Sequence, residues 1–117
     1  MAVVQTLARW SLERPGLFAY AAGMEGLAVS SRSTASRAKA MGLTAGEPDL
    51  RIYWSGGHWG AIELKLWDGK LTPSQRARHP ILVALGVPLE VVRARTPAEA
   101  VRLCTAILSR WTGCPAG

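Results

Sequence analysis

Two carboxylates and a lysine are the residues of this chain whose types and spacing are best suited to catalysis. Asp49 begins an apolar segment at residues 49–54, and Glu63 and Lys65 lie in the next one, at residues 59–66. Paired carboxylates bind hard divalent cations such as Mg²⁺, which also take water and substrate phosphate as ligands. A metal held in this way polarises a phosphoryl oxygen and lowers the pKa of a bound water. The three residues therefore predict a nuclease.

These side chains converge only if both segments are strands of one hairpin. Alternate side chains of a strand face opposite sides. If the apolar residues of both strands face one core, then Asp49, Glu63 and Lys65 share the other face. The apolar sets are Leu50, Ile52 and Trp54 in the first strand and Ile62, Leu64 and Leu66 in the second.

The connecting loop decides whether the two carboxylates meet. A two-residue loop at 56–57 would pair Leu50 with Glu63 and turn Asp49 to the wrong side, because a one-residue slip flips every side chain. A three-residue loop at 55–57, with a glycine in the left-handed conformation, pairs Asp49 with Glu63. We predict the three-residue loop or a bulge of equal effect. The alternative is that these residues are merely exposed and solvated.

Composition limits the classes of protein to which the chain can belong. Its 117 residues fit one domain, and 49% hydrophobic with 19% charged residues argues against disorder. The net charge of +6, mostly from arginine, makes nucleic acid a candidate partner. On charge alone, an ordinary basic soluble protein is an alternative.

The N-terminus, the cysteines and the histidines indicate the compartment of the protein and whether it has a structural zinc site. The N-terminus has neither the basic start of a signal peptide nor an apolar run that could span a membrane. Cys104 and Cys114 are too few for a structural zinc site, so we expect free thiols in a reducing cytoplasm. We expect the isolated His58 and His79 to be surface or DNA-facing residues and not metal ligands.

The remaining pattern predicts an α/β domain built around a small mixed sheet. Thr72 and Thr96 each read as an N-cap followed by proline at the first helical position. Pro80 should kink the first of these helices or break its hydrogen-bond ladder. The last helix carries an apolar stripe that is either core or partner surface. The expected helices are 2–13, 33–41, 73–84 and one starting at 97; the expected strands are 17–21, 26–29, 49–54, 59–66 and 89–93; and the stripe is Val101, Cys104, Leu108 and Trp111.

Five short motifs follow one another along the chain, namely RAKAMG at 37–42, GEPDL at 46–50, IELK at 62–65, GKLTPSQ at 69–75 and LGV at 85–87. Together they resemble the virus-type replication-repair nuclease (VRR-NUC) family of the PD-(D/E)xK, restriction-endonuclease-like superfamily. The resemblance covers roughly residues 33–100 and depends on the order and spacing of the motifs more than on any one of them.

This resemblance implies a restriction-endonuclease-like core and a DNA nuclease that depends on Mg²⁺ or Mn²⁺. Asp49 and Glu63 would bind the metal, and the backbone carbonyl of Leu64 would complete the protein's ligands. Lys65 would position or activate the attacking water. Gln75 would point into the site as a fourth catalytic residue, although a capping box would instead send its amide back to the helix start.

One feature of the family is missing at the expected place. The family commonly carries a glutamate on the first helix, near the metal, where this chain has no acidic residue. Gln5 could lie near the site, Glu13 could substitute, or the position could be vacant, which would favour one metal over two. Glu47, two residues before Asp49, should point the other way.

The resemblance also bears on the substrate and on assembly. The resemblance to stand-alone viral members of the family implies a homodimer. We therefore expect a phage-encoded homodimer that acts in the bacterial cytoplasm on branched DNA such as Holliday junctions. The apolar stripe or exposed tryptophans would supply the dimer interface. The alternatives are a nicking or restriction-type endonuclease with sequence preference and a non-catalytic DNA-binding module.

Basic residues around the expected site are candidates for phosphate contact, with a solvated basic face as the alternative. The candidates are Arg32, Arg37, Lys39, Lys70, Arg76 and Arg78. Four other arginines are expected at the opposite end of the domain and away from DNA, namely Arg93, Arg95, Arg102 and Arg110.

Overall fold

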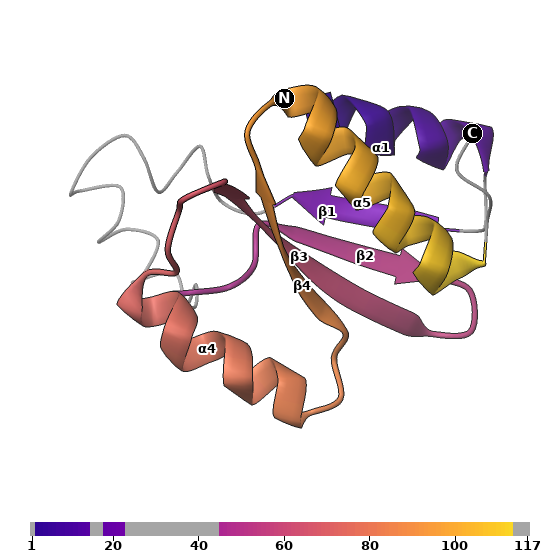
Figure 1. The fold of residues 1–117 in the computed structure, drawn as a ribbon. Coiled ribbons are helices and arrows are strands. Elements are labelled where there is room, and N and C mark those ends of the chain that lie inside the picture. The colour runs from indigo at the N-terminus through magenta and orange to yellow at the C-terminus, as the bar shows by residue number, and fades with distance from the viewer. Residues whose placement is uncertain (1, 15–17, 23–44, 114–117) are drawn as a thin grey trace, which may run out of the picture.

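The computed structural model describes residues 2–14, 18–22 and 45–113. In this part of the chain the sheet order is β1-β2-β3-β4, with β2 antiparallel to both β1 and β3, and β4 parallel to β3. Helices α1 and α5 lie on one face of the sheet and α4 lies on the other (Figure 1). The elements are α1 (Ala2–Glu13), β1 (Phe18–Ala22), β2 (Leu50–Trp54), β3 (His58–Leu66), α4 (Pro73–Ala84), β4 (Leu89–Ala94) and α5 (Pro97–Thr112).

The mixed α/β architecture confirms the predicted fold class at this level. Each described element lies close to its expected position, and α4 runs through Pro80 without interruption. The strand expected at 26–29 and the helix expected at 33–41 lie outside the described residues, as do Arg32, Arg37 and Lys39. Among the described helices, none combines the length and apolar character needed to cross a membrane.

The hydrophobic core lies between the sheet and the α1–α5 layer. The stripe on α5 belongs to this core, because Cys104 and Leu108 are buried and Trp111 stacks on Trp54 with ring centroids 5.5 Å apart. Of the two alternatives predicted for the stripe, the structure shows that it packs in the core. The core residues are Val3, Leu7, Trp10, Phe18, Leu50, Ile52, Ile62, Val92, Cys104, Ile107 and Leu108.

The β2–β3 connection confirms the predicted three-residue loop. Trp54 pairs with His58 and Leu50 with Ile62, so residues 55–57 form the loop. Gly56 and Gly57 have φ angles of 90° and 76°, in the left-handed region that glycine adopts without strain. Continued by one residue, this register sets Asp49 opposite Glu63, on the sheet face away from α1 and α5.

Gly46 allows the segment before β2 to approach the start of α4. Its φ is 84°, and a Cβ atom there would lie 2.3 Å from the carbonyl oxygen of Ser74. Gly86 has a similar φ of 89° with open space around it, which makes it a matched control. We expect Gly46→Ala to lower the free energy of unfolding by about 1–2 kcal/mol more than Gly86→Ala, since only the first adds a clash to the backbone strain. Equal losses in urea denaturation would contradict this contact.

Cys104 should be chemically inert in the folded protein. Its thiol is free and 1% exposed, and burial raises its pKa to about 11. Because the thiolate is the reactive form, we expect almost no reaction with a disulfide reagent at pH 8 until the protein unfolds. A Cys114→Ser variant makes Cys104 the sole thiol, and its labelling rate with and without denaturant is the measurement. Rapid labelling of the native variant would contradict the packing of α5.

Candidate active site

Asp49, Glu63 and Lys65 come together on the sheet face that α4 covers. Glu63 lies in β3 with 1% of its surface exposed, and Lys65 is partly buried two residues further along the same face. The Oδ2 atom of Asp49 accepts a hydrogen bond from the backbone N–H of Leu64 at 2.9 Å. This contact ties the carboxylate to the strand that carries Glu63. The three residues that the sequence singled out therefore form one cluster.

Gln75 makes the capping contacts and also points toward Glu63, so the two orientations that the sequence posed as alternatives occur together. Its side-chain Oε1 accepts a hydrogen bond from the backbone N–H of Thr72 at 2.9 Å. Its backbone N–H donates to the hydroxyl of Thr72 at 3.2 Å, which completes a capping box. Its Nε2 donates to Oε1 of Glu63 at 3.0 Å. One amide group thus caps α4 and holds the buried carboxylate.

Substitutions at the cap separate these two roles of Gln75. Thr72→Ala removes the cap alone and should cost about 1 kcal/mol of unfolding free energy. Gln75→Ala removes its share of the cap and also the bond to Glu63, so we expect about 1 kcal/mol more, because hydrogen bonds to a charged group are the stronger kind. Chemical denaturation of both variants is the measurement. A Gln75→Ala variant as stable as Thr72→Ala would mean that the Glu63 contact contributes nothing.

His79 also belongs to the cluster, and the prediction that it faces solvent or DNA is wrong. It is 5% exposed, and its Nε2 lies 3.4 Å from Oε1 of Glu63. Among the residues that the structure describes, neither ring nitrogen has a hydrogen-bond partner. The spacing from Gln75 carried a usable signal, since residues four apart on a helix share a face. The other histidine, His58, is exposed as expected and stacks on Trp54.

Charged groups of the cluster lie close enough to the His79 ring to shift its pKa. Burial lowers its pKa, Lys65 lowers it further, and Glu47 and Asp49 act in the opposite direction. The net shift is downward from the ordinary pKa of histidine, which favours the neutral imidazole at pH 7.

Glu47 lies on the α4 side of the sheet, so the prediction that it points away from Asp49 is wrong. Its Oε1 pairs with the guanidinium of Arg78 on α4, and its Oε2 lies 3.4 Å from a guanidinium nitrogen of Arg51 on β2. Glu47 therefore connects α4 to the segment that carries Asp49. Its two carboxylate oxygens are thus each paired with an arginine.

The candidate DNA-contact residues that the structure describes differ in exposure and in whether they are already paired. Lys70 is exposed, and Arg76 is exposed with one nitrogen bound to the carbonyl of Leu71 at 3.0 Å. Arg78 is the exception, because it is paired with Glu47. The expectation that Arg93 lies at the opposite end is wrong, because it pairs with Lys65 in register and donates to the carbonyl of Gly69 at 3.0 Å.

Arg95 also lies near this end, whereas Arg110 does not. The guanidinium of Arg95 sits over the Trp67 ring, 4.2 Å from its centroid, just beyond β3. Arg110 pairs with Glu90 at the other end of β4. The expectation of a distant position is therefore wrong for Arg95.

The first helix offers no acidic replacement for the family glutamate. Glu13 is at the end of α1 and forms ion pairs with Arg9 at 3.7 Å and Arg14 at 3.2 Å. Gln5 is exposed on α1, which lies across the opposite face of the sheet from the cluster (Figure 1). In the described residues, the carboxylates next to Lys65 thus come from β3 and the segment before β2.

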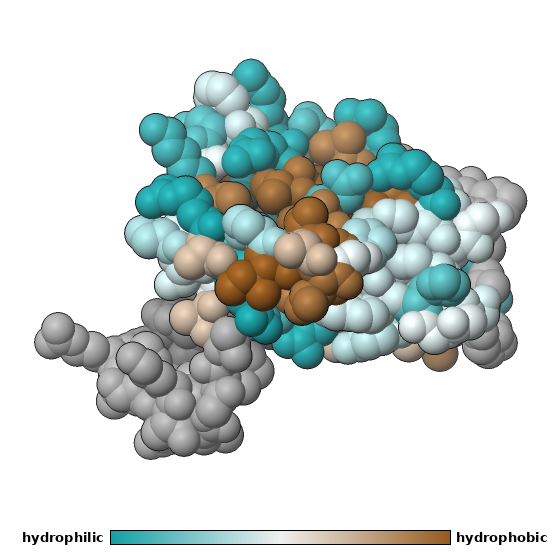
Figure 2. All heavy atoms as spheres, turned by 90° about the horizontal axis from the view of Figure 1, so that it is seen from below, coloured by the Kyte–Doolittle hydropathy of each residue, from teal (hydrophilic) through white to brown (hydrophobic). Residues whose placement is uncertain are grey.

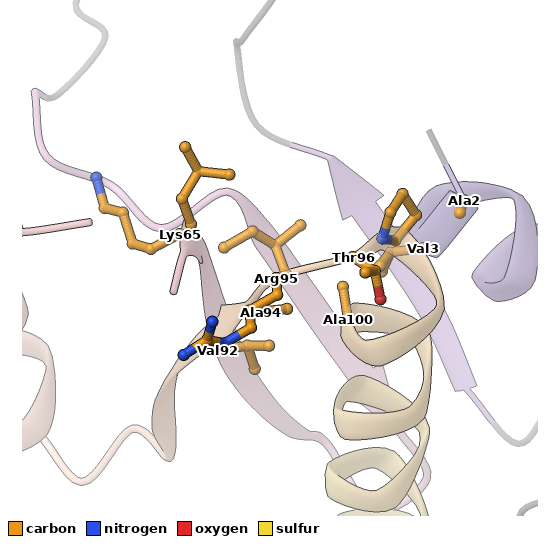
Figure 3. Close-up of a pocket in the computed structure, with 11 residues that line it drawn as sticks. Ala2, Val3, Lys65, Val92, Ala94, Arg95, Thr96 and Ala100 are labelled. Atoms are coloured by element: carbon orange, nitrogen blue, oxygen red, sulfur yellow. The ribbon is translucent and has the colours of Figure 1, made fainter. Parts of the chain in front are cut away.

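A cavity of about 430 Å³ lies between the start of α1, the ends of β3 and β4, and the start of α5. Its lining is apolar and includes Leu64, Val92 and Ala100. Lys65 extends away from the other labelled residues (Figure 3). Leu64 and Lys65 of β3 both line this cavity, so it adjoins the carboxylate cluster at that strand.

The chemistry of the donors suits a hard cation. Among the residues that the structure describes, no three His, Cys, Asp or Glu side chains form a metal-binding group. Two carboxylates and a backbone carbonyl supply oxygen alone, which fits Mg²⁺ or Mn²⁺, because these ions keep several waters and need few protein ligands. The fold is thus an α/β domain in which two carboxylates and a lysine gather on the sheet face that α4 covers. No protein-family model, curated protein or solved structure matches this chain.

Proposed function

We propose that this chain is a divalent-metal-dependent DNA endonuclease of the VRR-NUC type, with a restriction-endonuclease-like core. The observation that carries the proposal is the meeting of Asp49 and Glu63 beside Lys65, produced by the three-residue loop. The hydrogen bond from Gln75 to the buried Glu63 adds support, because it gives this glutamine the position that the family resemblance implies.

In this proposal, Asp49, Glu63 and the carbonyl of Leu64 hold Mg²⁺ or Mn²⁺. When bound, the ion would polarise a phosphoryl oxygen of the DNA and lower the pKa of a bound water. Lys65 places its ammonium near the scissile phosphate, offsets the charge that develops there and helps to orient the attacking water. Gln75 fixes the Glu63 carboxylate from α4, so that the ligand does not have to be ordered when the metal binds.

Two features support branched DNA as the substrate. The chain carries a net charge of +6, and the exposed Lys70, Arg76 and Arg93 lie on elements that flank the carboxylates. Phosphate contacts of this kind position DNA without reading its sequence. The described elements include no helix placed to read base edges, so we favour recognition of DNA shape, as in a Holliday junction or another branch.

Paired cuts across a junction require two sites, and we propose a homodimer to supply them. With the stripe on α5 inside the core, the exposed apolar side chains of α4 and the turn after it are the better interface candidate. These are Ile81, Val83 and Leu85, with 51%, 56% and 75% of their surfaces exposed. Figure 2, seen from below Figure 1, shows apolar residues gathered near the centre of this face.

The proposal is tested by cleavage of a labelled four-way junction, with linear duplex of the same sequence as the control. Each reaction contains Mn²⁺, Mg²⁺ or EDTA, and a second junction of unrelated sequence is included. Metal-dependent paired cuts in both junctions, with the duplexes intact, are the expected result. Cutting that follows sequence and not branching would indicate a nicking or restriction-type enzyme. Binding without cutting under every condition would overturn the enzyme and leave a DNA-binding module.

A further inference from the structure

An exposed pair of aromatic rings lies on the same sheet face as the carboxylates. Tyr53 of β2 and Trp59 of β3 are direct cross-strand partners. Their ring centroids are 6.4 Å apart with 26° between the ring planes. Tyr53 is 41% exposed and Trp59 is partly buried. Such a pair stabilises a hairpin, but it also leaves aromatic surface open to solvent beside a charged site.

Strand geometry fixes how far this pair lies from the carboxylates. Tyr53 is four residues from Asp49, and Trp59 is four residues from Glu63, so all four side chains share one face. At about 3.3 Å per residue, the separation is about 13 Å. Arg51 lies between them on this face with 45% of its side chain exposed, although it is paired with Glu47. A strand of DNA leaving the site in this direction therefore meets positive charge and then aromatic rings.

We propose that Tyr53 and Trp59 form a stacking platform for unpaired bases of a single DNA strand next to the cut. This inference rests on the proposed nuclease function and narrows its substrate. Aromatic side chains on adjacent strands of a sheet bind single strands by stacking, which every base permits whatever the sequence. The separation corresponds to about four nucleotides at 3.4 Å each, and to fewer in an extended strand.

The consequence is a substrate with unpaired nucleotides close to the scissile phosphate. Bases inside a continuous duplex are stacked on one another and cannot present a face to Tyr53 and Trp59. A flap, a fork or an opened junction arm can do so. The opposite face of the same hairpin is closed, because Trp54 is stacked between His58 and Trp111 with centroid distances of 5.8 Å and 5.5 Å. His58 therefore supplies an exposed control ring on the same hairpin.

The test is binding of a labelled oligodeoxythymidylate and of a duplex of equal length, measured by fluorescence anisotropy in EDTA. Tyr53→Leu and Trp59→Leu should each weaken binding of the single strand about tenfold and leave the duplex within about twofold. Tyr53→Phe keeps the ring and should bind like wild type, as should His58→Leu. Circular dichroism shows whether each variant is folded.

A second measurement does not require loss of either ring. Oligodeoxythymidylate should quench tryptophan fluorescence of the wild type, and Trp59→Phe should remove most of that quenching while binding is retained. Unchanged single-strand affinity in both leucine variants, or equal loss for single strand and duplex, would overturn the platform. The nuclease proposal has a different failing result, which is that the wild type shows no metal-dependent cleavage of any DNA.

Discussion

Glu63→Gln is expected to abolish metal-dependent cleavage while leaving the protein at least as stable as wild type. Loss of a carboxylate that binds the metal should reduce the cleavage rate by on the order of a thousandfold. Glu63 is 1% exposed, and burying a carboxylate costs free energy that a neutral amide avoids. Gln75 can still donate to the new amide oxygen. In EDTA, we expect the free energy of unfolding to rise by about 1 kcal/mol, or about 4 °C in Tm.

The control for this variant is Glu13→Gln, which changes an exposed glutamate on α1 that is paired with Arg9 and Arg14. It should cleave like wild type. Junction cleavage and thermal unfolding are measured on all three proteins. A Glu63→Gln variant that cleaves at the wild-type rate would remove Glu63 from the metal site. A variant that is inactive but strongly destabilised would make Glu63 a structural residue.

Two substitutions of Asp49 should separate its structural role from its catalytic role. Asp49→Ala leaves the backbone N–H of Leu64 without its acceptor, which should cost about 2 kcal/mol of unfolding free energy. Asp49→Asn retains an oxygen that can accept this bond, so it should cost less than about 1 kcal/mol. Both variants lose a negative metal ligand, and we expect both to lose cleavage. Urea denaturation and junction cleavage are the measurements.

Two outcomes of these Asp49 substitutions would contradict the assigned roles. If Asp49→Asn cleaves DNA normally, the carboxylate serves only to tie the segment before β2 to β3. If Asp49→Ala is as stable as Asp49→Asn, the bond to Leu64 is not a support of the hairpin end.

The hairpin and the meeting of its carboxylates were predictable because local rules determine them. Alternation of apolar residues set the faces, and a second requirement, that Asp49 and Glu63 share one face, selected the three-residue loop. The two helix starts at Thr72 and Thr96 were equally readable, since capping depends on residues within one turn. Even the two competing roles of Gln75 were both identified from sequence.

The errors concern contacts between elements that are distant in the chain. His79 is buried because α4 packs its inner face against β3, which no local pattern specifies. Arg93 lies near Lys65 because β4 pairs in parallel with β3, and the strand order did not follow from the pattern. Glu47 lies before β2 begins, and its ion pair with Arg78 of α4 positions it, which no local pattern specifies.

The central claim is that Asp49 and Glu63 together hold a divalent ion, and a titration of Mn²⁺ followed by electron paramagnetic resonance tests it most directly. The signal of free Mn²⁺ reports how much ion the protein binds, whether or not DNA is cut. We expect wild type and Glu13→Gln to bind Mn²⁺ alike, Mg²⁺ to displace it, and Asp49→Asn and Glu63→Gln to bind at least about tenfold more weakly. Wild-type protein that binds no Mn²⁺, or a Glu63→Gln variant that binds it equally well, would contradict the account.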